Sequence, residues 1–153
     1  MIRGYQFDKV EMVQYTLPED SDAAFQELVN KAASLVEKLG LHFQISKLAA
    51  GDISHSMART YDIEVYIPSI GIYKEVSSAS NARDYQARRG MVRYKSKDGR
   101  KGYVHTLNAS GWATSRVFPA ILEQYQQEDG SVIVPEVLRP FMGGIEVLKP
   151  IKK

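Results

Sequence analysis

The sequence predicts an α+β domain in which helices pack on a mainly antiparallel sheet. The chain has 153 residues, which is the size of one domain. Several short segments alternate polar and apolar residues and are separated by turn signals, which favours strands joined by hairpins. Other segments carry apolar residues at helical spacing between these strands. Strands and helices mixed in this way are typical of a sheet covered by helices.

The composition excludes several classes of protein. The chain contains no cysteine, so neither a disulfide nor a thiolate metal site is possible. No apolar run approaches the length of a membrane span, and the first residues lack the apolar core of a signal peptide. The net charge of +2 permits a nucleic-acid partner without arguing for one. We therefore expect a cytoplasmic protein with no membrane partner.

The first third of the chain contains the clearest helix. Residues 4–16 alternate as in a strand, and an acidic segment at residues 18–22 then opens a helix. The apolar residues of that helix recur with the spacing of one helical face, and Gly40 stands where a helix often ends. They are Phe25, Leu28, Val29, Ala32, Leu35, Val36 and Leu39.

The remaining elements follow from turn signals and periodicity. Strands are expected at residues 41–49, 61–67, 72–78, 91–95 and 102–109. The Asp98-Gly99 pair is a hairpin signal between the last two. Helices are expected at residues 81–88, 112–127 and 135–142, and a loop at 50–60.

The first strand offers one candidate site. Phe7 and Glu11 are four residues apart, so on a strand both side chains point the same way, about 13 Å apart. An aromatic ring can stack on a base, and a carboxylate can hold an ammonium group. The same alternation is also what any half-exposed strand shows, so both interpretations stay open.

A second candidate lies at residues 75–78. Glu75, Ser77 and Ser78 place a carboxylate and hydroxyls near the end of a strand. Such hard oxygen ligands suit Mg²⁺ together with phosphate oxygens. A strand that runs into a polar turn would carry the same residues for no functional reason.

The third candidate is the most specific in physical terms. Asn108 and Ser110 share strand parity, and Gly111 would let the strand turn into a helix. Arg116 would then lie in the first turns of that helix, where backbone N–H groups and the helix dipole favour phosphate. A capped, solvated helix end is the alternative.

Other polar groups give weaker indications. The three histidines are scattered without metal-ligand spacing, and no glycine-rich phosphate loop is present. A basic cluster could contact an RNA backbone, or could pair with nearby carboxylates. It comprises Arg83, Arg88, Arg89, Arg93 and Lys95.

Four ordered blocks resemble the catalytic half of seryl-tRNA synthetases. Residues 2–11 (IRGYQFDKVE) are similar to the second strand of that family's motif 2. Residues 60–68 (TYDIEVYIP) and 73–89 (YKEVSSASNARDYQARR) resemble the next signature blocks. Residues 105–116 (HTLNASGWATSR), 121–123 and 135–140 are similar to motif 3 and the tail. The resemblance covers nearly the whole chain.

The resemblance implies a partial class II aminoacyl-tRNA synthetase core, with ATP and Mg²⁺ bound on an antiparallel sheet. Phe7 would stack on adenine, while Arg3 and Arg116 contact the phosphates. The segment Glu75, Val76, Ser77 and Ser78 would bind ATP, with Glu75 and Ser78 at the metal. Glu11, Asn108 and Ser110 would hold serine. The implied reaction is the activation of serine to seryl-adenylate, followed by transfer to tRNA(Ser).

The chain also departs from the family pattern. Ala79 stands where a cysteine is usual and Trp112 where a smaller aliphatic residue is usual, and Pro119 falls inside the expected helix of motif 3. The tRNA-binding arm, motif 1 and the first strand of motif 2 have no counterpart in residues 1–153. We therefore expect the C-terminal portion of a catalytic domain, inactive without its N-terminal half or homodimer partner. The alternative is a non-catalytic binding or assembly protein derived from a synthetase.

Overall fold

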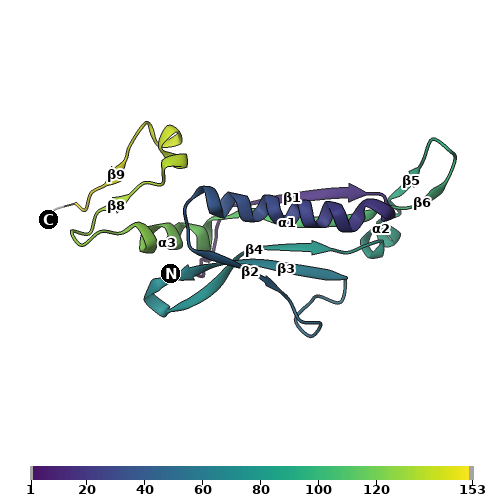
Figure 1. The fold of residues 1–153 in the computed structure, drawn as a ribbon, viewed down its shortest axis with the longest axis horizontal. Helices are drawn as coiled ribbons and strands as arrows, with labels where there is room; N and C mark the ends of the chain where they lie inside the picture. Colours follow the sequence, from purple (N-terminus) through teal and green to yellow (C-terminus); the bar gives the residue numbers. More distant parts are fainter. Residues whose placement is uncertain (1, 152–153) are drawn as a thin grey trace.

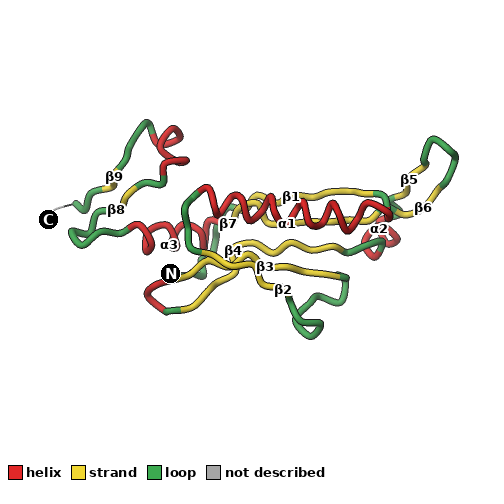
Figure 2. The backbone as a smooth tube through the Cα atoms, in the orientation of Figure 1, coloured by secondary structure: helices red, strands yellow, loops and turns green. Residues whose placement is uncertain are grey.

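A computed structural model describes residues 2–151. Residues 1 and 152–153 of the expected domain lie outside the described residues. Five strands in the described part form one antiparallel sheet, in the order β1, β7, β4, β3, β2 (Figures 1 and 2). They are β1 (Lys9–Thr16), β2 (Phe43–Lys47), β3 (Arg59–Ile67), β4 (Ile72–Asn81) and β7 (His105–Ala113). The predicted fold class is confirmed.

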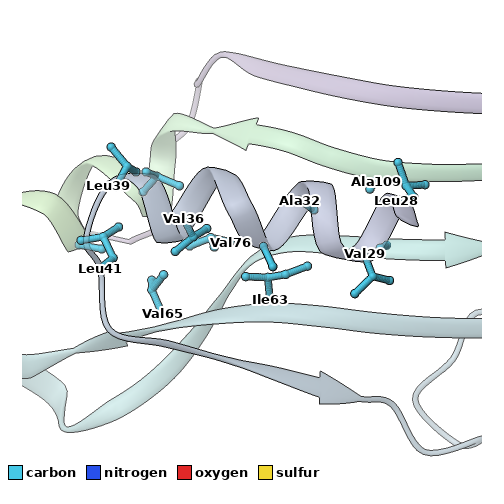
Figure 3. Packing of buried hydrophobic residues seen from close by; sticks show 14 of the residues in the cluster. Leu28, Val29, Ala32, Val36, Leu39, Leu41, Ile63, Val65, Val76 and Ala109 are labelled. Carbon is cyan, nitrogen blue, oxygen red and sulfur yellow. The ribbon is translucent and has the colours of Figure 1, made fainter. Parts of the chain in front are cut away.

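Helix α1 (Ser21–Lys38) lies along one face of this sheet and forms most of the core with it. Its apolar stripe faces the strands, so that Val29, Ala32 and Val36 lie over Ile63 and Val65 (Figure 3). The predicted end of the helix is also confirmed, because Gly40 has φ +67° and the backbone reverses there. A Cβ at Gly40 would lie 2.5 Å from the Tyr125 hydroxyl, so this position needs glycine for space as well as for conformation.

The smaller elements lie at the two ends of the sheet (Figure 1). At one end are α2 (Tyr85–Gly90) and a hairpin of β5 (Arg93–Lys95) and β6 (Lys101–Tyr103). At the other end are α3 (Thr114–Tyr125) and a second hairpin of β8 (Val132–Ile133) and β9 (Val147–Leu148). Three short 3-10 helices cover Pro18–Asp20, Pro68–Ile70 and Glu136–Met142. No helix among residues 2–151 combines the length and hydrophobicity of a membrane span.

The structure corrects the predicted start of the first strand. Residues 4–8 are not paired as a strand, and β1 begins only at Lys9. Instead, the backbone of Asp8 is bound to Thr114: the Asp8 N–H donates to the Thr114 hydroxyl at 3.1 Å, and the Thr114 N–H donates to the Asp8 carbonyl at 3.0 Å. The segment therefore crosses the beginning of α3, where the alternating pattern predicted a regular strand.

The boundaries of β7 and α3 also differ from the prediction. Gly111 does not turn the chain into a helix, because β7 continues through it to Ala113 and α3 begins at Thr114. Val104 separates β6 from β7, so the predicted strand 102–109 is two strands. Pro119 lies in the second turn of α3, and the helix continues through it. The proline ring leaves the Ser115 carbonyl without its usual helical donor.

Candidate functional site

The sheet face opposite α1 carries a row of polar side chains. Ile63 and Val65 point toward α1 (Figure 3). The alternating residues Asp62 and Glu64 therefore point to the other face. Residues that pair across neighbouring strands lie on the same face, so the pairing identifies the residues of β4, β7 and β1 on this face. The polar residues that register places on it include Thr60, Asp62, Glu64, Glu75, Ser78, Ser80, Asn108, Ser110 and Glu11.

Two bulges align this polar face. On β4, Glu75 pairs with Glu64 and Ser77 pairs with Ile63, which leaves Val76 as the extra residue. Glu75 and Ser78 are three residues apart and would face opposite sides of a regular strand, but the bulge puts both on the polar face. On β7, Gly111 is the extra residue opposite the Val10/Glu11 step of β1. The resulting register places Glu11 directly opposite Ser110.

The predicted serine-binding residues come together across β1 and β7. The Asn108 side-chain amide donates to Glu11 Oε1 at 3.0 Å, and Lys9 Nζ lies 3.0 Å from Glu11 Oε2. Ser110 is buried at the same place, and its carbonyl accepts a hydrogen bond from the Ser77 hydroxyl. Sequence reasoning missed Lys9, although its separation of two residues from Glu11 already placed both on one strand face.

An open pocket of about 340 Å³ lies beside this group. Its lining contains both the arginines and the aromatic ring that were predicted to contact ATP, namely Arg3, Arg116 and Phe7. The rest of the lining is Ile2, Gly4, Lys9, Glu75, Val76, Ser110, Ala113 and Ser115. Phe7 reaches the pocket from the segment before β1, not from the strand face predicted for it.

Arg116 is fixed at the wall of the pocket. It is the third residue of α3, and Nη1 donates to the Glu75 carbonyl at 2.7 Å and lies 3.4 Å from Glu75 Oε2. The Arg116 side chain remains about one-third exposed. An arginine beside the N-terminus of a helix provides both a charge and a fork of donors for phosphate oxygens.

The oxygen groups on β3 and β4 are suited to hold a magnesium ion that phosphate oxygens would also coordinate. No cluster of three acidic or histidine side chains suited to a metal occurs within residues 2–151. However, Asp62 is paired with Ser78 in register, and its Oδ1 atom is buried with no hydrogen-bond partner in the described structure. Magnesium in nucleotide sites is often held by one or two carboxylates together with phosphates and water. Glu75, Ser78 and Asp62 are the residues that would hold it.

Burial raises the pKa of the Asp62 carboxyl above its ordinary value of 3.8, and the neighbouring charges of Glu75 and Glu64 act in the same direction. The nearby Ser78 hydroxyl and the more distant charge of Arg116 oppose the shift. The folded chain therefore keeps this proton to higher pH than the unfolded chain does. In consequence, ionisation of Asp62 costs stability as pH rises above 3.8 and through the raised pKa.

We expect Asp62→Asn to make the ligand-free chain more stable at pH 7, because the amide avoids a buried, poorly solvated charge. Urea denaturation at a series of pH values from 3.5 to 7 would measure the difference between the two chains. The gain should shrink as pH falls toward 3.8, where the wild-type carboxyl is protonated in the folded state. A loss of stability of equal size at every pH would contradict this account.

Two residues of the predicted ATP segment have mainly structural contacts. The Val76 side chain belongs to the core cluster beneath α1, and the residue also lines the pocket. The Ser77 hydroxyl is buried and is bonded to the carbonyl of Ser110 on the next strand. Glu75 and Ser78, in contrast, have their side chains on the polar face. Sequence reasoning also missed Asp62, whose alternation with Glu64 was its only signal.

The fold and the pocket together define an antiparallel-sheet domain whose open face carries polar side chains beside an arginine-lined pocket. Residues 1–125 match the family described as the tRNA synthetase class II core domain (G, H, P, S and T). The chain is 68% identical over 144 residues to serine–tRNA ligase 2 of Clostridium acetobutylicum, covering 94% of this chain and 34% of that protein. It is 53% identical to the serine–tRNA ligase of Cellvibrio japonicus, over 100% of this chain and 36% of that protein.

Two solved structures of seryl-tRNA synthetases are also similar to this chain. The seryl-tRNA synthetase of Pyrococcus horikoshii complexed with ATP is 39% identical with a TM-score of 0.93, over 98% of this chain and 34% of that one. The cytoplasmic serine–tRNA ligase of Naegleria fowleri in complex with AMP is 34% identical with a TM-score of 0.91, over 99% of this chain and 36% of that one. The protein belongs to the class II tRNA synthetase core family. It spans about a third of the length of the curated relatives it matches.

Proposed function

We propose that this chain is part of a serine–tRNA ligase and that its polar sheet face binds ATP and serine to form seryl-adenylate. The observation that carries the proposal is the register across β1, β7 and β4. It puts Glu11, Asn108 and Ser110 next to a pocket walled by Arg116 and Glu75. The names of the relatives, which are serine–tRNA ligases, support the choice of amino acid and of tRNA(Ser).

In the proposed reaction, a carboxylate oxygen of serine attacks the α-phosphorus of ATP and pyrophosphate leaves. A hydroxyl of the terminal adenosine of tRNA then attacks the serine carbonyl carbon, and AMP leaves. Neither step needs a protein nucleophile, because positioning and the neutralisation of phosphate charge lower the barrier. This agrees with a site built from arginine, carboxylate, amide and hydroxyl groups. A magnesium ion held by Glu75, Ser78 and Asp62 would add positive charge at the phosphates.

The chain's own residues divide this work between two ends of the site. At the pocket, Phe7 offers a ring face for adenine, and Arg3 and Arg116 offer donors for phosphate oxygens. At the other end, Glu11 is bound to an ammonium group already, that of Lys9. We expect the serine ammonium to take the place of Lys9 at this carboxylate, with Asn108 holding Glu11 in position.

The edge of the sheet indicates where further protein completes the site. Strand β1 is at the edge of the five-stranded sheet, and Val10, Val13 and Tyr15 on it are each about 60% exposed. An uncovered edge strand of this kind is a template for another strand. We propose that the N-terminal half of the enzyme, or a homodimer partner, covers this edge in the active, cytoplasmic protein. Catalysis by the 153-residue chain alone is not expected.

A titration with a non-hydrolysable seryl-adenylate analogue tests the proposal without requiring catalysis. Calorimetry on the chain should give micromolar binding. Glu11→Ala should weaken it by about 10- to 150-fold, because a charge-assisted contact contributes about 1.5–3 kcal/mol. Glu37→Ala removes a solvent-exposed carboxylate from the end of α1 and should leave binding unchanged.

Two results would count against the ligase site. A folded chain that does not bind the analogue would favour the alternative of a non-catalytic assembly protein. Binding that Glu11→Ala leaves unaltered would place the analogue somewhere other than the polar face of the sheet.

A further inference from the structure

The positive charge of this chain is concentrated in one short segment. Residues 88–101 contain seven basic side chains and one acidic side chain, a net charge of +6, whereas the whole chain has +2. The rest of the molecule therefore has a net charge of −4. All seven basic residues of the segment are exposed, and the β5–β6 hairpin that carries most of them extends beyond the end of the sheet (Figure 1). We call the segment 88–103 the basic hairpin.

The hairpin holds like charges together at a cost to its own stability. Lys95 on β5 pairs directly with Lys101 on β6, and Arg93 pairs with Tyr103 on the same face. Like charges directly opposite each other destabilise a strand pair. Among the described residues, no carboxylate lies within ion-pair distance of Lys95, Lys97 or Lys101. An external anion would relieve this repulsion.

The fold nevertheless keeps the hairpin in shape without using these lysines. Tyr94 lies across Gly102, where an added Cβ would be 2.9 Å from the Tyr94 ring. At the turn, Asp98 binds Arg100, and Arg100 also reaches Glu19 on the body of the domain at 3.6 Å. Arg100 therefore anchors the hairpin, while the three lysines remain available to a partner.

Two further arginines lie beside aromatic rings. The Arg89 guanidinium carbon lies 3.5 Å from the centroid of Tyr85 and that of Arg93 lies 5.0 Å from the centroid of Tyr103, whose hydroxyl accepts a hydrogen bond from Arg93 Nη2. These contacts hold each guanidinium beside a ring while leaving other N–H donors for another group. Basic side chains interleaved with aromatic rings are a feature of surfaces that bind nucleic acids.

We propose that the basic hairpin binds the phosphate backbone of RNA. Lysine is depleted in the interfaces between proteins, whereas it binds phosphate readily as a point charge, which favours RNA over an acidic protein. The hairpin is also separate from the ATP pocket: β7 runs between them, and its nine residues span about 30 Å. The contact between the basic hairpin and RNA is therefore additional to the chemistry proposed for the pocket. Only the choice of tRNA as the natural ligand of the hairpin rests on the proposed function.

Fluorescence anisotropy with a labelled RNA duplex of arbitrary sequence tests this, using the 153-residue chain without ATP or serine. The test variant carries Lys95→Gln, Lys97→Gln and Lys101→Gln. The matched control carries Lys31→Gln, Lys38→Gln and Lys47→Gln, three exposed lysines elsewhere. Wild type and control should bind with a steep salt dependence. The test variant should bind at least about tenfold more weakly, with a salt slope lower by about 2 to 3, because each lost phosphate contact removes about 0.9.

Additional measurements make each outcome decisive. Thermal unfolding of the test variant should be unchanged or improved, since the Lys95–Lys101 repulsion is gone, and the three corresponding Lys→Arg substitutions should retain binding. Equal weakening by the control, no binding of RNA by wild type, or tighter binding to an acidic peptide than to RNA would each overturn the proposal. Arg116→Ala should leave RNA binding intact, so failure of this inference is distinguishable from failure of the ATP site.

Discussion

Replacing Arg116 with alanine is expected to weaken the binding of ATP to this chain by about 10- to 150-fold. The estimate comes from the loss of charge-assisted hydrogen bonds, about 1.5–3 kcal/mol, from the wall of the pocket. Arg116 is suited to this role because α3 presents it in its first turn and Glu75 fixes its guanidinium through two contacts. Calorimetric titration with ATP and Mg²⁺ is the measurement.

Two companion variants make the Arg116 result specific. Arg116→Lys keeps the charge but not the planar fork, so its binding should fall between those of wild type and Arg116→Ala. Arg139→Ala removes an arginine that is bound to Glu146 and is absent from the pocket lining, and it should bind ATP normally. If Arg139→Ala weakened binding as much as Arg116→Ala, the loss of any positive charge would explain the result. Arg116 would then have no specific role in binding ATP.

The largest effect on stability is expected at Phe25, where substitution by alanine should cost about 3–5 kcal/mol. Phe25 is completely buried between α1 and the sheet, and its ring meets the edge of Tyr61 at a centroid distance of 5.4 Å. The cost includes both lost apolar burial and the cavity left in the core. Since domains of this size are stable by only about 5–15 kcal/mol, the variant should lose a large fraction of its stability. Urea denaturation followed by circular dichroism would measure the loss.

Phe141 provides the matched control because it is the same residue type but 85% exposed. Phe141→Ala should change the free energy of unfolding by less than about 0.5 kcal/mol. Similar losses for the two variants would mean that α1 and the sheet do not form the core described.

The amphipathic pattern of α1 and the alternation on β3 and β7 made much of the fold predictable. The apolar spacing from Phe25 to Leu39 required a partner surface, and the sheet supplies it. Strand parity correctly placed Asn108 and Ser110 on one face. β1 pairs with β7, which brings Glu11 to Asn108, 97 residues further along the sequence. Local sequence patterns could not predict this pairing.

The irregular parts of the site could not be predicted from periodicity. A bulge adds one residue to a strand, so the side chains beyond it change faces. Glu75 and Ser78 therefore share a face, although simple alternation would place them on opposite faces. Likewise, Phe7 approaches the pocket from an irregular segment bonded to Thr114, although its spacing from Glu11 suggested a common strand. Strand alternation placed Lys9 with Glu11 and Asp62 with Glu64, and their surroundings in the fold mark them as candidate site residues.

The polar face of the sheet, opposite α1, is the proposed binding site for ATP. Mapping of amide chemical shifts by NMR during titration with ATP and Mg²⁺ tests it directly, since every strand reports separately. We expect the largest changes at Glu75, Ser78 and Arg116, with little change along α1. The account would be contradicted if the largest changes occurred in the basic hairpin or on α1 while the amides around Arg116 stayed unmoved.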